Sequence, residues 1–109
     1  MSSDMYKNII QEITNELGLD VETAAEFLND YLAQLPDEIA NLKNSIENND
    51  FVTGAALAHS LKGTSGNLRI MPLHKIMAEL EQALKSPEAG MVAQLMLDLA
   101  LIVTDLKAD

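Results

Sequence analysis

The apolar residues of this chain recur at intervals of three and four along most of its length, which is the period of an amphipathic α-helix. The first such stripe consists of Ile9, Ile13 and Leu17. It predicts a helix that is capped by Ser3 or Asp4, runs to about Leu17 and stops at Gly18.

The second stripe passes through a proline without losing its register. Asp20 is a plausible N-cap, and the apolar residues that follow are Leu28, Leu32, Leu35, Ile39, Leu42 and Ile46. A proline inside a helix removes a hydrogen bond and costs about 3 kcal/mol, so two helices that meet at Pro36 are the alternative. The uninterrupted stripe favours one long, kinked helix that ends near Asn48.

Three further helices are predicted, each after a start signal. Asn49 or Asp50 caps a helix over residues 51–68. Pro72 fits the first turn of a fourth helix, and Ser86-Pro87 repeats that signal for a fifth. The apolar faces of these last two helices consist of Leu73, Ile76, Met77, Leu80 and Leu84, and of Val92, Leu95, Met96, Leu99, Ile102, Val103 and Leu106.

Short connections between consecutive helices imply antiparallel neighbours. We therefore expect an all-α fold: an up-and-down antiparallel four-helix bundle over residues 20–107, with an additional N-terminal helix over residues 1–18. The 109 residues suit a single domain over 1–109, and their 48% apolar content is enough for one core. Plentiful Ala, Leu, Ile and Met with few aromatic residues also favours helices over sheets.

Composition narrows the possible functions. The chain has no cysteine, which excludes disulfides and thiol catalysis and weakens any zinc site. No positively charged start leads into an apolar run, so a secretory signal is not expected. The most apolar stretch, residues 91–103, contains Gln94 and Asp98 and is too short to cross a bilayer. We expect a soluble cytoplasmic protein.

Charge is distributed unevenly along the chain. The net charge of −10 argues against nucleic acid or an anionic membrane as the main partner. Residues 1–50 hold eleven acids and only Lys7 and Lys43 as bases. Residues 51–78 hold no acid but carry Lys62, Arg69, Lys75 and both histidines. An acidic molecule therefore has one neutral-to-basic segment, for which chance clustering of a few charges is the alternative explanation.

His59 lies on the side of its predicted helix that is opposite the apolar stripe of Leu57, Leu61 and Leu68. The residues on the histidine side are Val52, Ala55, Ala56, Lys62, Gly63 and Gly66. We expect His59 at or near the surface, among small side chains. Because both glycines lie outside the core stripe, internal packing explains them poorly, and we expect them to let another molecule reach the imidazole.

An exposed imidazole is largely neutral near pH 7 and is a good nucleophile. Lys62, three residues further on, shares its face and can offset negative charge that arrives at the ring. A surface histidine without any such role is the alternative. Catalytic zinc fits less well, because His59 and His74 lack an HExxH-type spacing. A hydrolytic triad is excluded for Ser60, which points about 100° away from His59 on the helical wheel.

The segment AHSLKGTSGNL, Ala58 to Leu68, resembles the signature of histidine phosphotransfer (HPt) domains. That signature reads approximately Ala-His-x-Leu-Lys-Gly-Ser/Thr-Ala/Ser-x-Asn-Leu-Gly, and eleven consecutive positions fit it. The motif lies on the third of five predicted helices, and a LEQAL-type helix follows. The resemblance in fold covers residues 20–107, and the first helix is similar to an N-terminal elaboration of some members.

The resemblance implies a role for each motif residue. His59 would accept a phosphoryl group from the aspartyl phosphate of a response-regulator receiver domain and pass it to another receiver. Lys62 would neutralise the phosphoryl oxygens, and Gly63 would give the receiver's active site room to close. In the family, an acidic or amide residue 22 positions after the histidine often hydrogen-bonds the ring, and here it is Glu81. It flanks the core stripe and would fix the tautomer, unless it is an ordinary surface glutamate.

The resemblance also implies how the work is divided with the partner. Val52, Ala55, Ala56, Gly63 and Gly66 would form the apolar centre of a modest, transient interface. The receiver would supply the carboxylates and Mg²⁺, so we expect no cofactor of the chain's own, no ATP binding and no autokinase activity. The expected partners are receiver domains and a hybrid sensor histidine kinase, and the expected state is a monomer.

Two positions depart from the family pattern. Gly66 occupies the second open position (x) of the signature, where a small alanine is usual, and Arg69 replaces the usual glycine after Asn-Leu. Arg69 comes seven residues after Lys62, so we expect it on the same side of the helix as a second cationic contact for an acidic receiver. Two rival functions stay open: a non-catalytic helical adaptor that binds receivers or kinases, and a helical dimerisation module.

Overall fold

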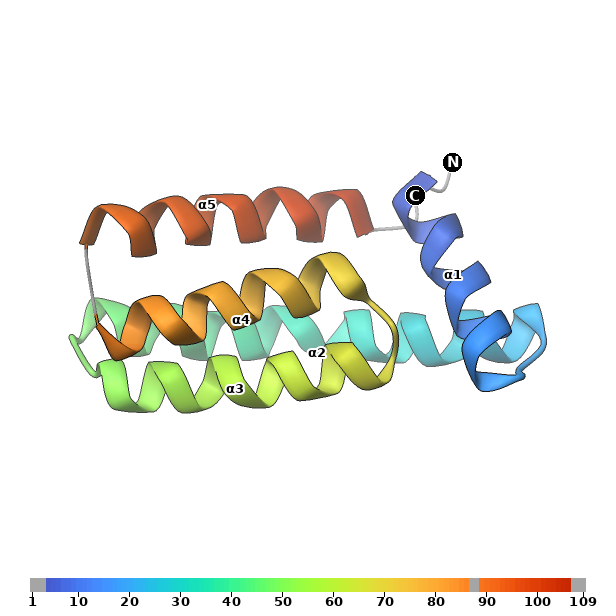
Figure 1. Cartoon of the computed structure of the whole chain (residues 1–109), viewed down its shortest axis with the longest axis horizontal. Coiled ribbons are helices and arrows are strands. Elements are labelled where there is room, and N and C mark those ends of the chain that lie inside the picture. The colour runs from blue at the N-terminus through green and yellow to red at the C-terminus, as the bar shows by residue number, and fades with distance from the viewer. Residues whose placement is uncertain (1–3, 87–88, 107–109) are drawn as a thin grey trace.

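The computed structural model describes residues 4–86 and 89–106. These residues contain five helices and no strand. The helices are α1 (Asp4–Leu17), α2 (Val21–Glu47), α3 (Phe51–Asn67), α4 (Met71–Lys85) and α5 (Ala89–Leu106). The fold is an all-α bundle with an extra N-terminal helix, as the apolar stripes predicted (Figure 1). Ser3 and Pro87, which were assigned to start signals, lie outside the described residues.

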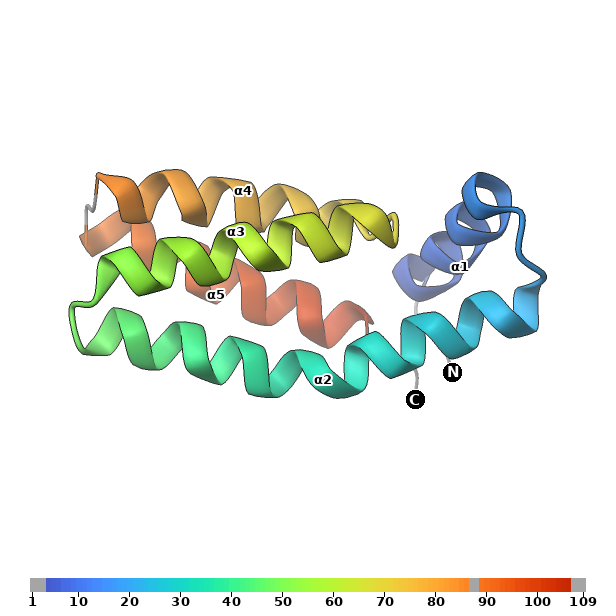
Figure 2. The ribbon, with the colours of Figure 1, turned by 90° about the horizontal axis from the view of Figure 1, so that it is seen from below.

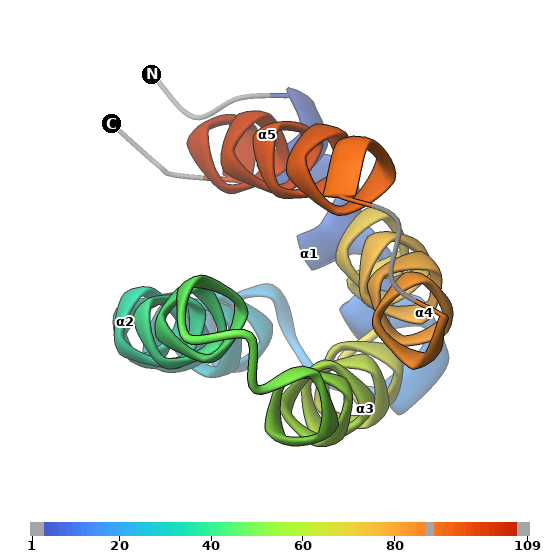
Figure 3. The same ribbon diagram turned by 90° about the vertical axis from the view of Figure 1, so that its left-hand side faces the viewer.

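The bundle is built around the pair α3 and α4, which have the most extensive contact of any two helices. Helix α2 packs on α3, and α5 packs on α4. Seen end-on, α2, α3, α4 and α5 follow one another around an arc (Figure 3). Helix α1 contacts α2 and α5 and lies beyond the ends of α3 and α4 (Figure 2). None of the described helices is long and apolar enough to cross a membrane.

Helix α2 continues through Pro36, so the prediction of one long helix is confirmed. Leu28, Leu35 and Leu42 are fully buried on it, while Pro36 is exposed. Side-chain caps begin α2 and α3 as predicted. The Asp20 carboxylate accepts a hydrogen bond from the Thr23 amide at 2.7 Å.

Small side chains bring α3 close to its neighbours. The buried residues of α3 are Gly54, Ala58, Leu61 and Ser65. A Cβ atom at Gly54 would lie 3.4 Å from Cδ1 of Leu84 on α4. Leu57 and Leu68, placed in the core stripe by sequence, are only partly buried. The buried face of α3 therefore consists of smaller side chains than its leucines suggested.

A residue with left-handed backbone that is not a glycine follows the end of α3. Arg69 has φ of +60°. Its amide donates to the Gly66 carbonyl at 3.1 Å, and the Ile70 amide donates to the Ser65 carbonyl at 2.9 Å. This is the Schellman motif, in which glycine usually occupies the left-handed position. Arg69 therefore occupies a backbone position that glycine adopts more easily.

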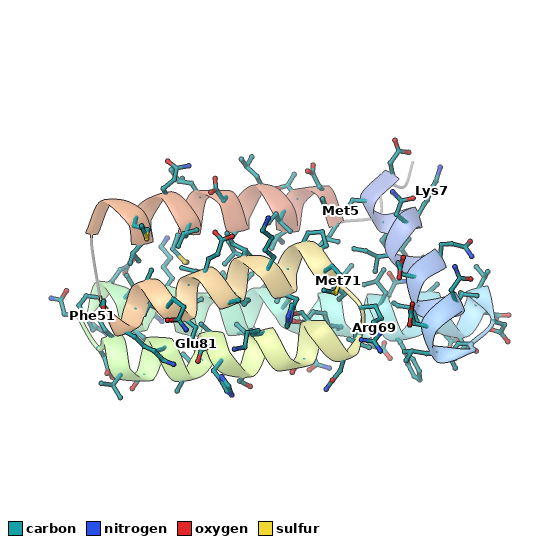
Figure 4. All side chains as sticks on the ribbon, in the orientation of Figure 1. Met5, Lys7, Phe51, Arg69, Met71 and Glu81 are labelled. Carbon is teal, nitrogen blue, oxygen red and sulfur yellow. The ribbon has the colours of Figure 1, made fainter. Side chains whose placement is uncertain are left out.

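The expectation that Arg69 shares a helix face with Lys62 is wrong. The helical wheel assumes that α3 continues, whereas it ends at Asn67 and the chain then turns left-handed. Arg69 lies at the end of α3, where Figure 4 also shows Met71 from the start of α4. It lines a groove there together with Met5, Asn8, Ile9, Glu12, Met71 and Pro72.

We predict that Arg69→Gly raises the free energy of unfolding by about 1 kcal/mol, because glycine adopts the left-handed region without the Cβ clash. Urea unfolding followed by circular dichroism measures this. Arg69→Ala is the matched control: it removes the same side chain but keeps a Cβ, and it should give no comparable gain. Equal stability of the Gly and Ala variants would contradict the explanation.

Candidate functional site

A buried carboxylate on α4 contacts three basic side chains. Glu81 is 5% exposed and lies where α4 meets α3 (Figure 4). Its Oε1 accepts a hydrogen bond from Lys62 Nζ at 2.7 Å. Its Oε2 lies 3.0 Å from His59 Nδ1 and 3.2 Å from Lys85 Nζ. Glu81 thus faces α3, and the alternative of an ordinary surface glutamate is wrong.

These contacts keep Glu81 ionised. The hydrogen bond from Lys62 is the main cause that lowers the pKa of Glu81 to about 2, and Lys85 and His59 contribute in the same direction. Burial alone would raise the pKa of a carboxyl group, because it penalises the charged form. The pairing with the lysines therefore outweighs desolvation, and the carboxylate is charged at any pH near neutrality.

An ionised carboxylate can only accept hydrogen bonds, so the 3.0 Å contact requires His59 Nδ1 to carry a proton. In the neutral ring, Nε2 then holds the free lone pair. The His59 side chain is 67% exposed, and Nε2 has no hydrogen-bond partner among the described residues. The arrangement is that of an oriented nucleophile: one nitrogen is held by the protein and the other is open to an incoming group.

Lys62 and Lys85 hold the carboxylate from two helices. The sequence placed Lys62 beside His59, and the structure pairs its Nζ with Glu81 while 29% of the side chain stays exposed. Lys85 was missed. Its spacing of four residues from Glu81 was readable as a helical ion pair, but only the burial of Glu81 makes that pair part of a site.

An apolar groove runs along the site between α3 and α4. His59 and Glu81 line it, and the other lining residues are Phe51, Val52, Ala55, Ala56, Leu84 and Lys85. Val52 is 84% exposed and gives this groove an open apolar side chain. Three of the residues predicted to form a docking surface therefore share one groove with the histidine.

The two glycines of the motif have different surroundings. A Cβ at Gly63 would have no neighbour within 4 Å, so this exposed position is open. A Cβ at Gly66 would lie 2.8 Å from Nδ1 of His74. The His74 ring is fixed there because Nδ1 donates to the Lys62 carbonyl at 2.8 Å. The expectation that packing does not explain Gly66 is wrong: it makes room for His74.

Comparison with known families agrees with this geometry. The family model of the Hpt domain matches residues 26–109, and the chain belongs to that family. The match begins inside α2 and leaves α1 outside it. None of the curated proteins and none of the solved structures compared with the chain matched it.

Membership defines the general class of function. Hpt domains are phosphotransfer modules of two-component phosphorelays, and they are carriers of the phosphoryl group, not kinases. Their partners are the receiver domains of response regulators. Across residues 4–86 and 89–106, no group of three or more His, Asp or Glu side chains is placed to hold a metal ion.

The contacts of Glu81 with its basic partners make the stability of the fold depend on pH. The folded-state pKa of about 2 lies below the ordinary value of 4.5, so the folded state favours the ionised form. The stabilisation is complete above about pH 5 and is lost as pH falls toward 2. We predict that the difference in unfolding free energy between wild type and Glu81→Gln shrinks across this range.

Urea unfolding at a series of pH values measures that difference. Glu79→Gln is the matched control, since Glu79 is an exposed glutamate on the same helix. A difference between wild type and Glu81→Gln that stays constant from pH 5 to pH 2 would show that Glu81 is not held as an anion.

Proposed function

We propose that this chain carries phosphoryl groups on Nε2 of His59, which it accepts from the aspartyl phosphate of one receiver domain and passes to another. The observation that supports this most strongly is the contact of His59 Nδ1 with the Glu81 carboxylate at 3.0 Å. It orients a solvent-exposed ring so that its second nitrogen is the nucleophile. The Hpt family match supplies the class of reaction.

The transfer needs no proton to move. The Nε2 lone pair attacks phosphorus, the N–P bond forms, and the bond from phosphorus to the aspartyl oxygen breaks. The bonding electrons leave with that oxygen as the receiver's carboxylate. The imidazole becomes positively charged and keeps its proton on Nδ1, where the Glu81 anion stabilises it. The return reaction runs through the same arrangement, so the site serves both directions.

Lys62 would change partners during transfer. Its Nζ lies on Glu81 in the free protein, three residues along α3 from His59. An ammonium on a flexible stem can turn from the carboxylate to phosphoryl oxygens, where it would offset their charge. The open space at Gly63 would let the receiver's active site close over the ring.

The receiver would dock on the groove beside His59. Val52, Ala55 and Ala56 provide a small apolar centre for a transient interface. Lys62, a basic residue of the acid-free segment 51–78 that pairs with Glu81 in this site, would face an acidic receiver surface. Gly66 packs against His74, and its place in this apolar centre stays a prediction. A contact with Arg69 would require the interface to reach past the end of α3.

The partner would supply what the chain does not carry. Mg²⁺ and the carboxylates that bind it belong to the receiver in this scheme. The domain itself would bind no ATP and would act as a monomer in the cytoplasm, between receiver domains and a hybrid sensor kinase. The rival function, an adaptor that binds receivers without being phosphorylated, would not need the ring to be oriented by an anion.

Labelled receiver domains test the proposal. The protein is mixed with a panel of ³²P-phosphorylated receivers, and we predict acid-labile, base-stable label on the wild type that is lost in His59→Gln. His74→Gln is the matched control and should keep the label, because that ring donates its Nδ1 proton to a backbone carbonyl. Binding without label would favour the adaptor, and no label from any receiver would overturn phosphotransfer.

A further inference from the structure

Lys85 contacts the site from outside the family signature. It lies in the last turn of α4, where its Nζ is 3.2 Å from Oε2 of Glu81. Its side chain is 55% exposed and lines the groove beside His59. Glutamate four residues before lysine is the favourable order for a helical pair, and a cation is stabilised at the C-terminal end of a helix. The position of Lys85 near the carboxylate therefore does not depend on Lys62.

The transfer reaction creates a problem for Glu81. Its carboxylate is buried, and a buried charge is costly unless it is paired. Lys62 holds Oε1 alone, whereas His59 and Lys85 share Oε2. If Lys62 turns to the phosphoryl group, Oε1 loses the only cationic partner that it has among the described residues. The remaining cations of the cluster are the imidazolium ring and Lys85.

We propose that Lys85 is a positioning residue that holds the Glu81 carboxylate in place when Lys62 moves to the phosphoryl group. This inference rests on the proposed function and deepens it. The two lysines divide the work: one from α3 follows the phosphoryl group, and one from α4 stays with the carboxylate. Glu81 then keeps its hydrogen bond with Nδ1 throughout the transfer, so the ring stays oriented in both directions.

Two simpler roles of Lys85 make different predictions. As an ordinary surface pair with Glu81, Lys85 would support the helix and have no effect on the reaction. As a docking contact, it would matter only when a receiver is present. A small phosphoryl donor separates these cases, because phosphoramidate can phosphorylate an exposed imidazole without docking on the groove.

The experiment compares three variants of the full chain with wild type. Lys85→Met removes the charge, Lys85→Arg keeps it, and Lys75→Met makes the same charge change at an exposed position of α4. Phosphorylation of His59 by phosphoramidate is followed by ³¹P NMR. We expect Lys85→Met to lower the maximal rate about tenfold, with no change in the phosphoramidate concentration for half-maximal rate. The maximal rate of Lys85→Arg should stay within about twofold of the wild-type rate. The maximal rate of Lys75→Met should equal the wild-type rate.

A spectroscopic signature adds a second readout. The ¹⁵N signals of the Lys62 and Lys85 ammonium groups should both move when His59 is phosphorylated, while that of Lys75 stays constant. Circular dichroism establishes that each variant is folded, and Lys85→Gln replaces Lys85→Met if the latter is not.

Each outcome has a distinct meaning. A rate for Lys85→Met equal to that of Lys75→Met overturns the inference while leaving the proposed function standing. A defect with receivers but not with phosphoramidate also overturns it, in favour of docking. No label on wild-type His59 from any donor overturns the proposed function, and this inference with it.

Discussion

The site depends on one buried negative charge between two helices. Glu81 on α4 needs cationic partners because it is almost entirely removed from water, and it finds them on both sides of the α3–α4 contact. The small buried residues Gly54 and Ala58 let α3 pack closely enough for His59 to reach the carboxylate on α4. The close packing of α3 on α4 thus also determines how the His59 ring is oriented.

Helix α3 and the turn after it contain three residues that are locally unfavourable for stability, each for a different reason. Gly63 lies in the open near His59, where a Cβ would have no neighbour within 4 Å in the free protein, and the proposed receiver would use that space. Gly66 is required by the fold, since His74 occupies the space of its missing Cβ. Arg69 strains the turn that follows, in a position where glycine would fit better. Only the first of these costs serves the proposed reaction directly.

The periodicity of the sequence was sufficient to predict the helices and the exposed position of His59. The stripe through Pro36 and the caps at Asp20 and Asp50 rest on local rules that the structure obeys. Gly66 and Arg69 were misplaced because a helical wheel treats a helix as isolated and unending. Neither the ring of His74 nor the left-handed end of α3 is visible on it. Lys85 was missed because the burial of Glu81 depends on packing between helices.

The most direct test of this account is the protonation of the His59 ring in the free protein. In ¹⁵N NMR at a pH where the ring is neutral, we expect the proton on Nδ1 and the lone pair on Nε2, with the preference lost in Glu81→Ala. Because the measurement needs no partner, it tests the geometry apart from the reaction. A proton on Nε2 in the wild type would contradict the central claim that Glu81 orients the nucleophile.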